Sequence, residues 1–180
     1  TALLQKHGIS HCSVNGDTRF DRVAQLARNT QRIEAVERFK GRAPLLVAGS
    51  TWPEDEQLLS SALQALPNDV KMVIAPHEIG QGHLRQLENL LSRYATLRYS
   101  QASGHNFTDY RILIIDNIGM LSSVYAYADV AYVGGAFKTG LHNILEPATF
   151  GIPVVFGPHY HKFLEAHQLI REKGAFSIKD

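Results

Sequence analysis

The residues with the clearest chemical pattern lie between positions 134 and 146. Gly134 and Gly135 follow a short apolar run that predicts a buried strand, and a helix is expected to begin just after Gly140. A glycine loop in front of a helix gathers backbone N–H groups and the positive end of the helix dipole. Both features stabilise negative charge, so the pattern indicates a phosphate-binding loop.

Three polar side chains share one face of the first turn of that expected helix. His142, Asn143 and Glu146 are three and four residues apart in the sequence. A carboxylate is a poor ligand for a phosphate, but it suits the two hydroxyl groups of a ribose. The alternative is a plain strand–helix turn whose carboxylate only interacts with the helix N-terminus. Because an isolated glycine-rich turn is a weak signal, the residues alone leave both interpretations open.

Other polar residues fall in turns that follow other expected strands. Ser50 and Thr51 could cap the next helix or direct their hydroxyl groups to a ligand. His77 could donate a hydrogen bond to a ligand, or it could be structural. Arg19 could face the same ligand or form an ion pair with Asp21.

The remaining candidates have weaker patterns. Lys138 is either a solvated loop lysine or a contact for a phosphate or a carboxylate. His159 and His161 resemble a metal-binding pair, but no third ligand lies nearby in the sequence, so no metal site is predicted. Three tyrosines are expected to pack around the strand before the glycine loop: Tyr125, Tyr127 and Tyr132.

Strands and helices are expected to alternate along the whole chain and to position these residues. The expected strands are at 9–16, 43–50, 70–76, 96–100, 110–116, 129–133 and 152–156, and the chain stops on a further strand-like segment. These strands are continuously apolar rather than alternating, which predicts an α/β fold: a Rossmann-like parallel sheet with helices on both faces. Ligands of such sheets bind outside the carboxyl ends of the strands, where these polar turns fall.

Composition excludes several classes of protein. The 180 residues suffice for one domain, and the net charge of +1 gives no electrostatic reason to expect nucleic acid as a partner. Cys12 is the only cysteine, so no internal disulfide can form. The turn after the first expected strand lacks G-x-G-x-x-G, which argues against a dinucleotide oxidoreductase. Without an initiator Met or signal-peptide pattern, the chain is expected to be a piece of a longer protein.

Five segments together resemble one enzyme family, and they cover nearly the whole chain in order. The chain resembles the carboxyl-terminal domain of 3-deoxy-D-manno-octulosonic acid (Kdo) transferases, which are glycosyltransferases of the two-domain GT-B type. The segments are GDTRFD (16–21), AGSTWPEDE (48–56), APHEIG (75–80), IDNIGMLSSVYAYADVAYVGGAF (115–137) and GLHNILEPATFGIPVVFGPHYHKF (140–163).

The resemblance implies a function that is divided between two domains. Residues 1–180 would form a single nucleotide-sugar-binding domain that holds the donor, CMP-Kdo, without a cofactor or metal. An amino-terminal domain, absent from this chain, would hold the catalytic base and the lipid A precursor that accepts Kdo. A membrane anchor, also absent, would precede that domain. The full-length protein would then work at the membrane surface, on the cytoplasmic side of the bacterial inner membrane.

The resemblance also implies roles for particular residues. Glu146 with Gly134, Gly135 and Asn143 matches the nucleotide-binding loop and helix of the family. Further donor-side matches are Ser50, Thr51, His77 and Arg19, and Lys138 is added as a candidate donor contact. The catalytic residues are left unassigned because the base is expected on the missing domain.

Three residues depart from the family pattern. Pro76 stands where an Arg is usual, Trp52 where a His is common, and Met120 where a Glu commonly follows the glycine. Without the Arg at position 76, one cation for the donor could be missing. Without the Glu at position 120, recognition of the nucleobase near Gly119 is left open. Two alternatives stay open: a GT-B enzyme that uses a UDP-sugar, and a non-catalytic nucleotide-binding module.

Overall fold

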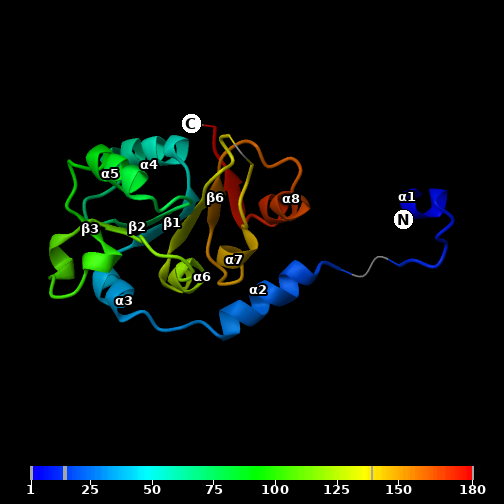
Figure 1. Ribbon diagram of the computed structural model, residues 1–180, viewed down its shortest axis with the longest axis horizontal. Helices are drawn as coiled ribbons and strands as arrows, with labels where there is room; N and C mark the ends of the chain where they lie inside the picture. Colours follow the sequence, from blue (N-terminus) through cyan, green and yellow to red (C-terminus); the bar gives the residue numbers. More distant parts are fainter. Residues whose placement is uncertain (1, 14–15, 139, 180) are drawn as a thin grey trace.

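A parallel sheet forms the centre of the protein. The computed structural model describes residues 2–13, 16–138 and 140–179, and in this part the strands pair in the order β3-β4-β2-β1-β5-β6-β7, every pair parallel (Figure 1). The strands are β1 (Leu45–Thr51), β2 (Lys71–Pro76), β3 (Thr96–Arg98), β4 (Ile112–Ile114), β5 (Val130–Val133), β6 (Val154–Phe156) and β7 (Ala175–Ser177).

The order of the strands creates a crevice at β1 and β5. From β1 the chain builds the sheet outward through β2 on one side, and it then returns to place β5 on the other side of β1. In open α/β sheets this reversal separates the loops that follow the two neighbouring strands, and ligands bind there. The turn at Ser50 and the loop at Gly134 therefore flank the expected ligand site.

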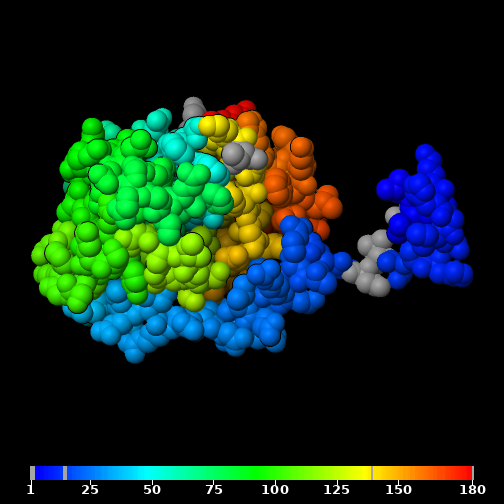
Figure 2. Space-filling model, viewed as in Figure 1, coloured from blue at the N-terminus to red at the C-terminus, as the bar shows by residue number. Residues whose placement is uncertain are grey.

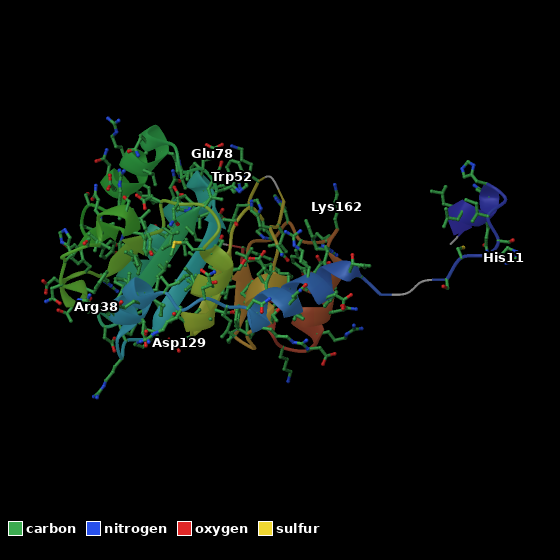
Figure 3. All side chains as sticks on the ribbon, turned by 60° about the horizontal axis from the view of Figure 1, so that its bottom comes forward. His11, Arg38, Trp52, Glu78, Asp129 and Lys162 are labelled. Atoms are coloured by element: carbon green, nitrogen blue, oxygen red, sulfur yellow. The ribbon has the colours of Figure 1, made fainter. Side chains whose placement is uncertain are left out.

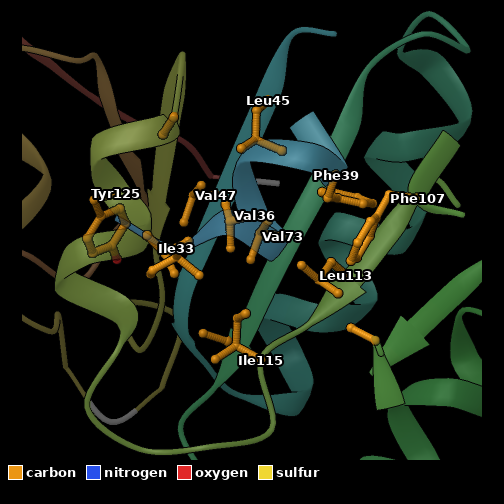
Figure 4. Packing of buried hydrophobic residues seen from close by; sticks show 14 of the residues in the cluster. Ile33, Val36, Phe39, Leu45, Val47, Val73, Phe107, Leu113, Ile115 and Tyr125 are labelled. Atoms are coloured by element: carbon orange, nitrogen blue, oxygen red, sulfur yellow. The ribbon is translucent and has the colours of Figure 1, made fainter. Parts of the chain in front are cut away.

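Helices cover both faces of the sheet, as its apolar strands require. On one face lie α4 (Pro53–Ala65) and α5 (Gln81–Leu90), whose leucines pack on Met72, Ile74 and Tyr132. The opposite face carries α3 (Glu34–Lys40), where Val36 and Phe39 are fully buried against β1, β2 and β4 (Figure 4).

Short helices surround β5 and β6. They are α6 (Leu121–Val124), the 3₁₀ turn η3 (Tyr125–Tyr127) and α7 (Leu145–Ala148), followed by α8 (Leu164–Arg171), which packs through Ala166 beside β6 and β7. Two further 3₁₀ turns, η1 (Tyr99–Gln101) and η2 (Phe107–Asp109), lie between β3 and β4. No helix of the described residues is both long and apolar enough to span a bilayer.

The amino-terminal segment differs from expectation. The strand expected at 9–16 is wrong for its described residues, which make no sheet pairing; residues 14 and 15 lie outside the described part. This segment and α1 (Ala2–Lys6) extend away from the sheet, and Ile9 is 47% exposed (Figures 1 and 2). An apolar run without a neighbouring strand cannot satisfy its backbone groups in a sheet. The helix expected next is present as α2 (Thr18–Arg28), capped by the Asp17 carboxylate.

Candidate functional site

A strained turn ends β1 at the crevice. Ser50 has a φ of 52°, a left-handed conformation that costs free energy in a residue other than glycine. The turn remains tied to β5, because the Gly134 N–H donates to the Gly49 carbonyl at 2.9 Å. Strain of this kind concentrates at functional sites, which makes the turn a candidate ligand contact.

Neither hydroxyl group of this turn caps α4, contrary to one expectation. Thr51 is the last residue of β1, is 1% exposed, and donates its hydroxyl to Glu56 Oε1 at 3.1 Å. Glu56 Oε1 also forms a hydrogen bond with His83 Nε2 at 2.9 Å, and burial raises the pKa of the Glu56 carboxyl. Helix α4 starts after Trp52, whose N–H donates to the Asp55 carboxylate. Of the two residues, Ser50 alone stays available for a ligand.

Asp55 links the turn after β1 to the loop after β5. Its carboxylate is 1% exposed and accepts the N–H groups of Trp52 and Gly135, each at 2.9 Å. It also accepts the hydroxyl of Tyr132 at 2.5 Å, and burial is the main cause that raises the pKa of this tyrosine. One buried charge therefore holds three separate donors, as a buried charge requires.

The two glycines of the loop allow close packing instead of offering free amides. A Cβ on Gly134 would lie 2.4 Å from the Ser50 carbonyl oxygen, and one on Gly135 would lie 2.4 Å from the Gly140 carbonyl oxygen. Gly135 also has a φ of 92°, which side-chain-bearing residues avoid. The expectation that these two amides bind a phosphate needs correction, because their N–H groups are donated to Gly49 and Asp55.

The expected helix after Gly140 begins later and is shorter. Helix α7 covers Leu145–Ala148, so His142 and Asn143 lie in the preceding loop and do not share its first turn. A helix of four residues sums few peptide dipoles, so it adds little positive potential for a phosphate. Side chains must therefore supply most of the recognition.

Glu146 is a carboxylate with a fixed orientation. Its Oε2 accepts the Ser122 hydroxyl at 2.6 Å, and its Oε1 accepts Asn143 Nδ2 at 3.0 Å. Asn143 is held in turn, because its Oδ1 accepts the Leu145 N–H at 3.1 Å. This half-buried carboxylate keeps lone pairs available, which is what a ribose diol would need.

Three aromatic rings stack where β1, β2 and the glycine loop end. This ring cluster consists of Trp52, His77 and His142. His77 lies 4.6 Å from each of the other two ring centroids, at 25° to Trp52 and 29° to His142. Trp52 Nε1 donates to His142 Nε2 at 2.9 Å. Trp52, labelled in Figure 3, directly follows the last residue of β1. The predicted contact His77 thus stands next to the loop.

Two hollows open beside these groups. The smaller, of about 310 Å³, is lined by His142, Asn143, Glu146 and Arg19, among others. The larger, of about 880 Å³, is lined by Ser122 and Gly119, by parts of α3, and by the segment that follows β3. The hydrogen bond between Ser122 and Glu146 joins a residue of each hollow, so a nucleotide extending from one to the other would pass the carboxylate.

Arg19 lines the smaller hollow, and the alternative interpretation, an ion pair with Asp21, is wrong. It pairs with Asp17 at 2.6 Å and with Glu165 at 2.7 Å, and not with Asp21. Hydrogen bonds to these two carboxylates raise its pKa. Lys138 is exposed on the loop and pairs with Glu54 at 3.0 Å. Both cations therefore carry acidic partners that a phosphate would have to displace or share.

The remaining candidates are the two histidines after β6 and the tyrosines around β5. Within the described residues, no group of three or more His, Cys, Asp or Glu side chains could hold a metal ion. The ring of His161 lies against that of Tyr160 at a tilt of 35°, with ring centroids 4.8 Å apart. Tyr125 and Tyr132 are 2% exposed and pack in the core as expected.

Sequence reasoning missed several groups that shape the site: Asp55, Trp52 as the partner of His142, Ser122 and Glu165. All of them act through contacts between segments far apart in the chain. The one local signal was the spacing of Asp55, at the third position of α4, where a carboxylate commonly accepts the N–H of the residue before the helix.

Known proteins with a similar sequence carry one recurring name. A 3-deoxy-D-manno-octulosonic acid transferase of Chlamydophila psittaci is 33% identical over 133 residues, which are 73% of this chain and 30% of that protein. The Rickettsia bellii protein of the same name is 28% identical over 181 residues, or 96% of this chain and 42% of that protein. The chain thus spans well under half the length of these relatives. No family model matches it.

Solved structures show the same fold. The C-terminal CMP-Kdo binding domain of WaaA from Acinetobacter baumannii superposes with a TM-score of 0.67 at 23% identity, over 89% of this chain and 82% of that one. An α,α-trehalose-phosphate synthase from Burkholderia xenovorans gives a TM-score of 0.55 at 15% identity over 38% of its length. The parallel sheet is that of the carboxyl-terminal, Rossmann-like half of a GT-B glycosyltransferase, which confirms the expected fold class.

Proposed function

Because the chain is homologous to 3-deoxy-D-manno-octulosonic acid transferases over most of its length, we propose that it is the donor-binding domain of such an enzyme. In this proposal the domain, residues 1–180, binds CMP-Kdo at the crevice between β1 and β5. The observation that carries the proposal is the carboxylate of Glu146, which Ser122 and Asn143 hold at the edge of the smaller hollow. That carboxylate is proposed to accept the ribose hydroxyl groups.

The charged and polar groups around Glu146 are assigned to the rest of the donor. Arg19 lines the same hollow and is proposed to meet the phosphate or the Kdo carboxylate. Lys138 on the glycine loop and the strained turn at Ser50 are assigned to the same end of the donor. His77 is placed at the sugar or phosphate through its position in the ring cluster.

The proposed reaction needs groups that this chain does not supply. An acceptor hydroxyl attacks the anomeric carbon of Kdo, and the bond to the phosphate oxygen breaks so that CMP leaves with the electron pair. Positive charge and N–H donors on this domain stabilise the departing phosphate. A base must remove the hydroxyl proton, and Glu146 is already committed to the ribose. We assign the base to the remaining part of the full-length protein.

The same division applies to the acceptor. In the proposal the remaining part binds a lipid A precursor and contacts the membrane surface, on the cytoplasmic side of the bacterial inner membrane. The fragment alone is then expected to bind the donor without transferring Kdo, because catalysis requires the acceptor, the base and the donor at reacting distance. Product from the fragment with CMP-Kdo and a lipid A precursor, at a rate near that of a full-length enzyme, would contradict this division.

A nucleotide titration tests the donor assignment. CMP should bind more tightly than UMP or NAD in calorimetry, and it should shift the amide NMR signals of Gly135, Lys138 and Asn143. The variant Glu146→Gln should weaken CMP binding, whereas the matched control Glu172→Gln changes an exposed carboxylate at the end of α8 and should leave it unchanged. Amide shifts confined to the amino ends of the strands would contradict the proposed site.

A further inference from the structure

The ring cluster fixes one of the two nitrogen atoms of His142 as an acceptor. Trp52 Nε1–H can only donate, and it lies 2.9 Å from His142 Nε2. A nitrogen that receives this hydrogen bond carries no proton of its own. The proton of a neutral imidazole must then be on Nδ1, because the hydrogen bond made by one ring nitrogen sets the protonation of the other.

From this contact we propose that Trp52 holds His142 as a neutral imidazole protonated on Nδ1, and that this Nδ1–H is a donor of the nucleotide site. The second part rests on the proposed function. Trp52 is a positioning residue in this scheme, and His142 is the group that touches the ligand. The ligand is identified only as an oxygen acceptor on the nucleotide, such as a phosphate oxygen or a ribose hydroxyl.

The surroundings of His142 bring its side chain to the proposed ligand site. The side chain lines the smaller hollow together with Glu146 and Arg19. Its ring packs against the loop, because a Cβ on Gly135 would lie 2.7 Å from His142 Cδ2. Within the described residues no hydrogen bond is made by Nδ1, so its N–H remains available.

Burial, helped by the neighbouring His77, favours the neutral form of His142. Burial lowers the pKa of His142 most, and the neighbouring His77 lowers it further, while Asp55 opposes both. Protonation would place a second N–H against Trp52 Nε1–H, so it would break the hydrogen bond. The other charged groups that line the same hollow are Arg19, Arg22, Glu146 and Glu165.

Nitrogen-15 NMR of the histidine side chains tests the first part of the proposal directly. At pH 7.5, well above the lowered pKa, His142 should show a protonated Nδ1 and an unprotonated Nε2. In Trp52→Phe the proton should move toward Nε2 and the pKa of His142 should rise toward about 6.5. The control His77→Phe keeps a stacked ring and should leave the tautomer unchanged. A proton on Nε2 in the unaltered protein, or the same tautomer in Trp52→Phe, would overturn the proposal.

CMP affinity tests the second part. Asparagine can place an N–H donor where histidine has Nδ1, whereas phenylalanine cannot. His142→Asn should therefore bind CMP within about threefold of the unaltered protein, and His142→Phe should lose roughly three- to tenfold, the value of one neutral hydrogen bond. Circular dichroism checks that both variants are folded. Equal affinities for the two variants would overturn the donor role of Nδ1–H.

The two measurements separate the inference from the proposed function. If CMP does not bind the unaltered protein, the proposed function and the ligand role of His142 are both overturned. The tautomer is measured without any ligand, so the role of Trp52 is then still decided by the NMR result.

Discussion

Replacing Asp55 with alanine tests whether one buried carboxylate holds the turn after β1 and the loop after β5 together. The change removes three accepted hydrogen bonds, from Trp52 N–H, Gly135 N–H and the Tyr132 hydroxyl. Hydrogen bonds to a charged group contribute about 1.5–3 kcal/mol each, and they are not additive when they share one acceptor. Because buried donors are left without partners, we expect a loss of about 3–5 kcal/mol in the free energy of unfolding.

Urea unfolding followed by circular dichroism measures this loss. A domain of this size has about 5–15 kcal/mol of stability, so Asp55→Ala should stay folded but unfold at a clearly lower urea concentration. The melting temperature should fall by roughly 6–20 °C. Asp55→Asn keeps an oxygen for the two backbone N–H groups, so its loss should be smaller.

Glu54 provides the matched control. It precedes Asp55 on the same helical turn, but its partner is the exposed Lys138. An exposed ion pair contributes little, so Glu54→Ala should leave the urea midpoint nearly unchanged. If Asp55→Ala cost less than about 1 kcal/mol, or no more than Glu54→Ala, the carboxylate would not be what links the two segments.

Three other changes test the site. Glu146→Gln should weaken CMP roughly 10- to 100-fold in calorimetry, because a charge-assisted bond to ribose is lost, yet it should not weaken inorganic phosphate; unchanged CMP affinity would reject the ribose role. Gly135→Ala should displace the loop and abolish detectable CMP binding, since its Cβ would lie 2.4 Å from a carbonyl oxygen at a φ of 92°; a variant that still binds CMP would show the loop to be only a turn. Because the pKa of His142 is lowered in the folded state, the folded state binds fewer protons than the unfolded state. The contribution of His142 to stability is therefore complete above about pH 6.5, and it is lost as the pH falls through the folded-state pKa. The urea midpoint of the unaltered protein should therefore fall more between pH 7.5 and 5.5 than that of His142→Asn, and equal decreases would refute this reasoning.

The positions of the strands could be predicted because their apolar runs are local. β4 is buried at Ile112, Leu113 and Ile114, and its sequence is the most continuous apolar strand of the chain. The run that starts at Ile9 is more polar, with Ser10 and His11, and it pairs with nothing in the described residues. A strand depends on a neighbour, and the sequence of one segment does not say whether that neighbour exists.

The location of the site could be predicted from the sequence, but most of its side-chain contacts could not. The carboxyl ends of β1, β2 and β5 follow from the order of elements, so Ser50, His77 and Gly134 were placed at one edge correctly. The partners of those residues depend on packing. Asp55 follows the rule for acidic residues in the first turn of a helix, yet the helix turns it inward to meet Gly135.

This difference changes what the glycines explain. A phosphate loop that works through its amides needs those amides free, and here Gly134 and Gly135 have donated theirs to Gly49 and Asp55. The glycines instead let the loop approach the turn at Ser50 closely enough for one carboxylate to reach both. The loop is thus held before any ligand arrives, and a preorganised site loses less free energy in binding. In the proposed function, recognition is then left to side chains around the loop, such as His142 and Glu146, and substitutions there are expected to change nucleotide affinity without altering the sheet.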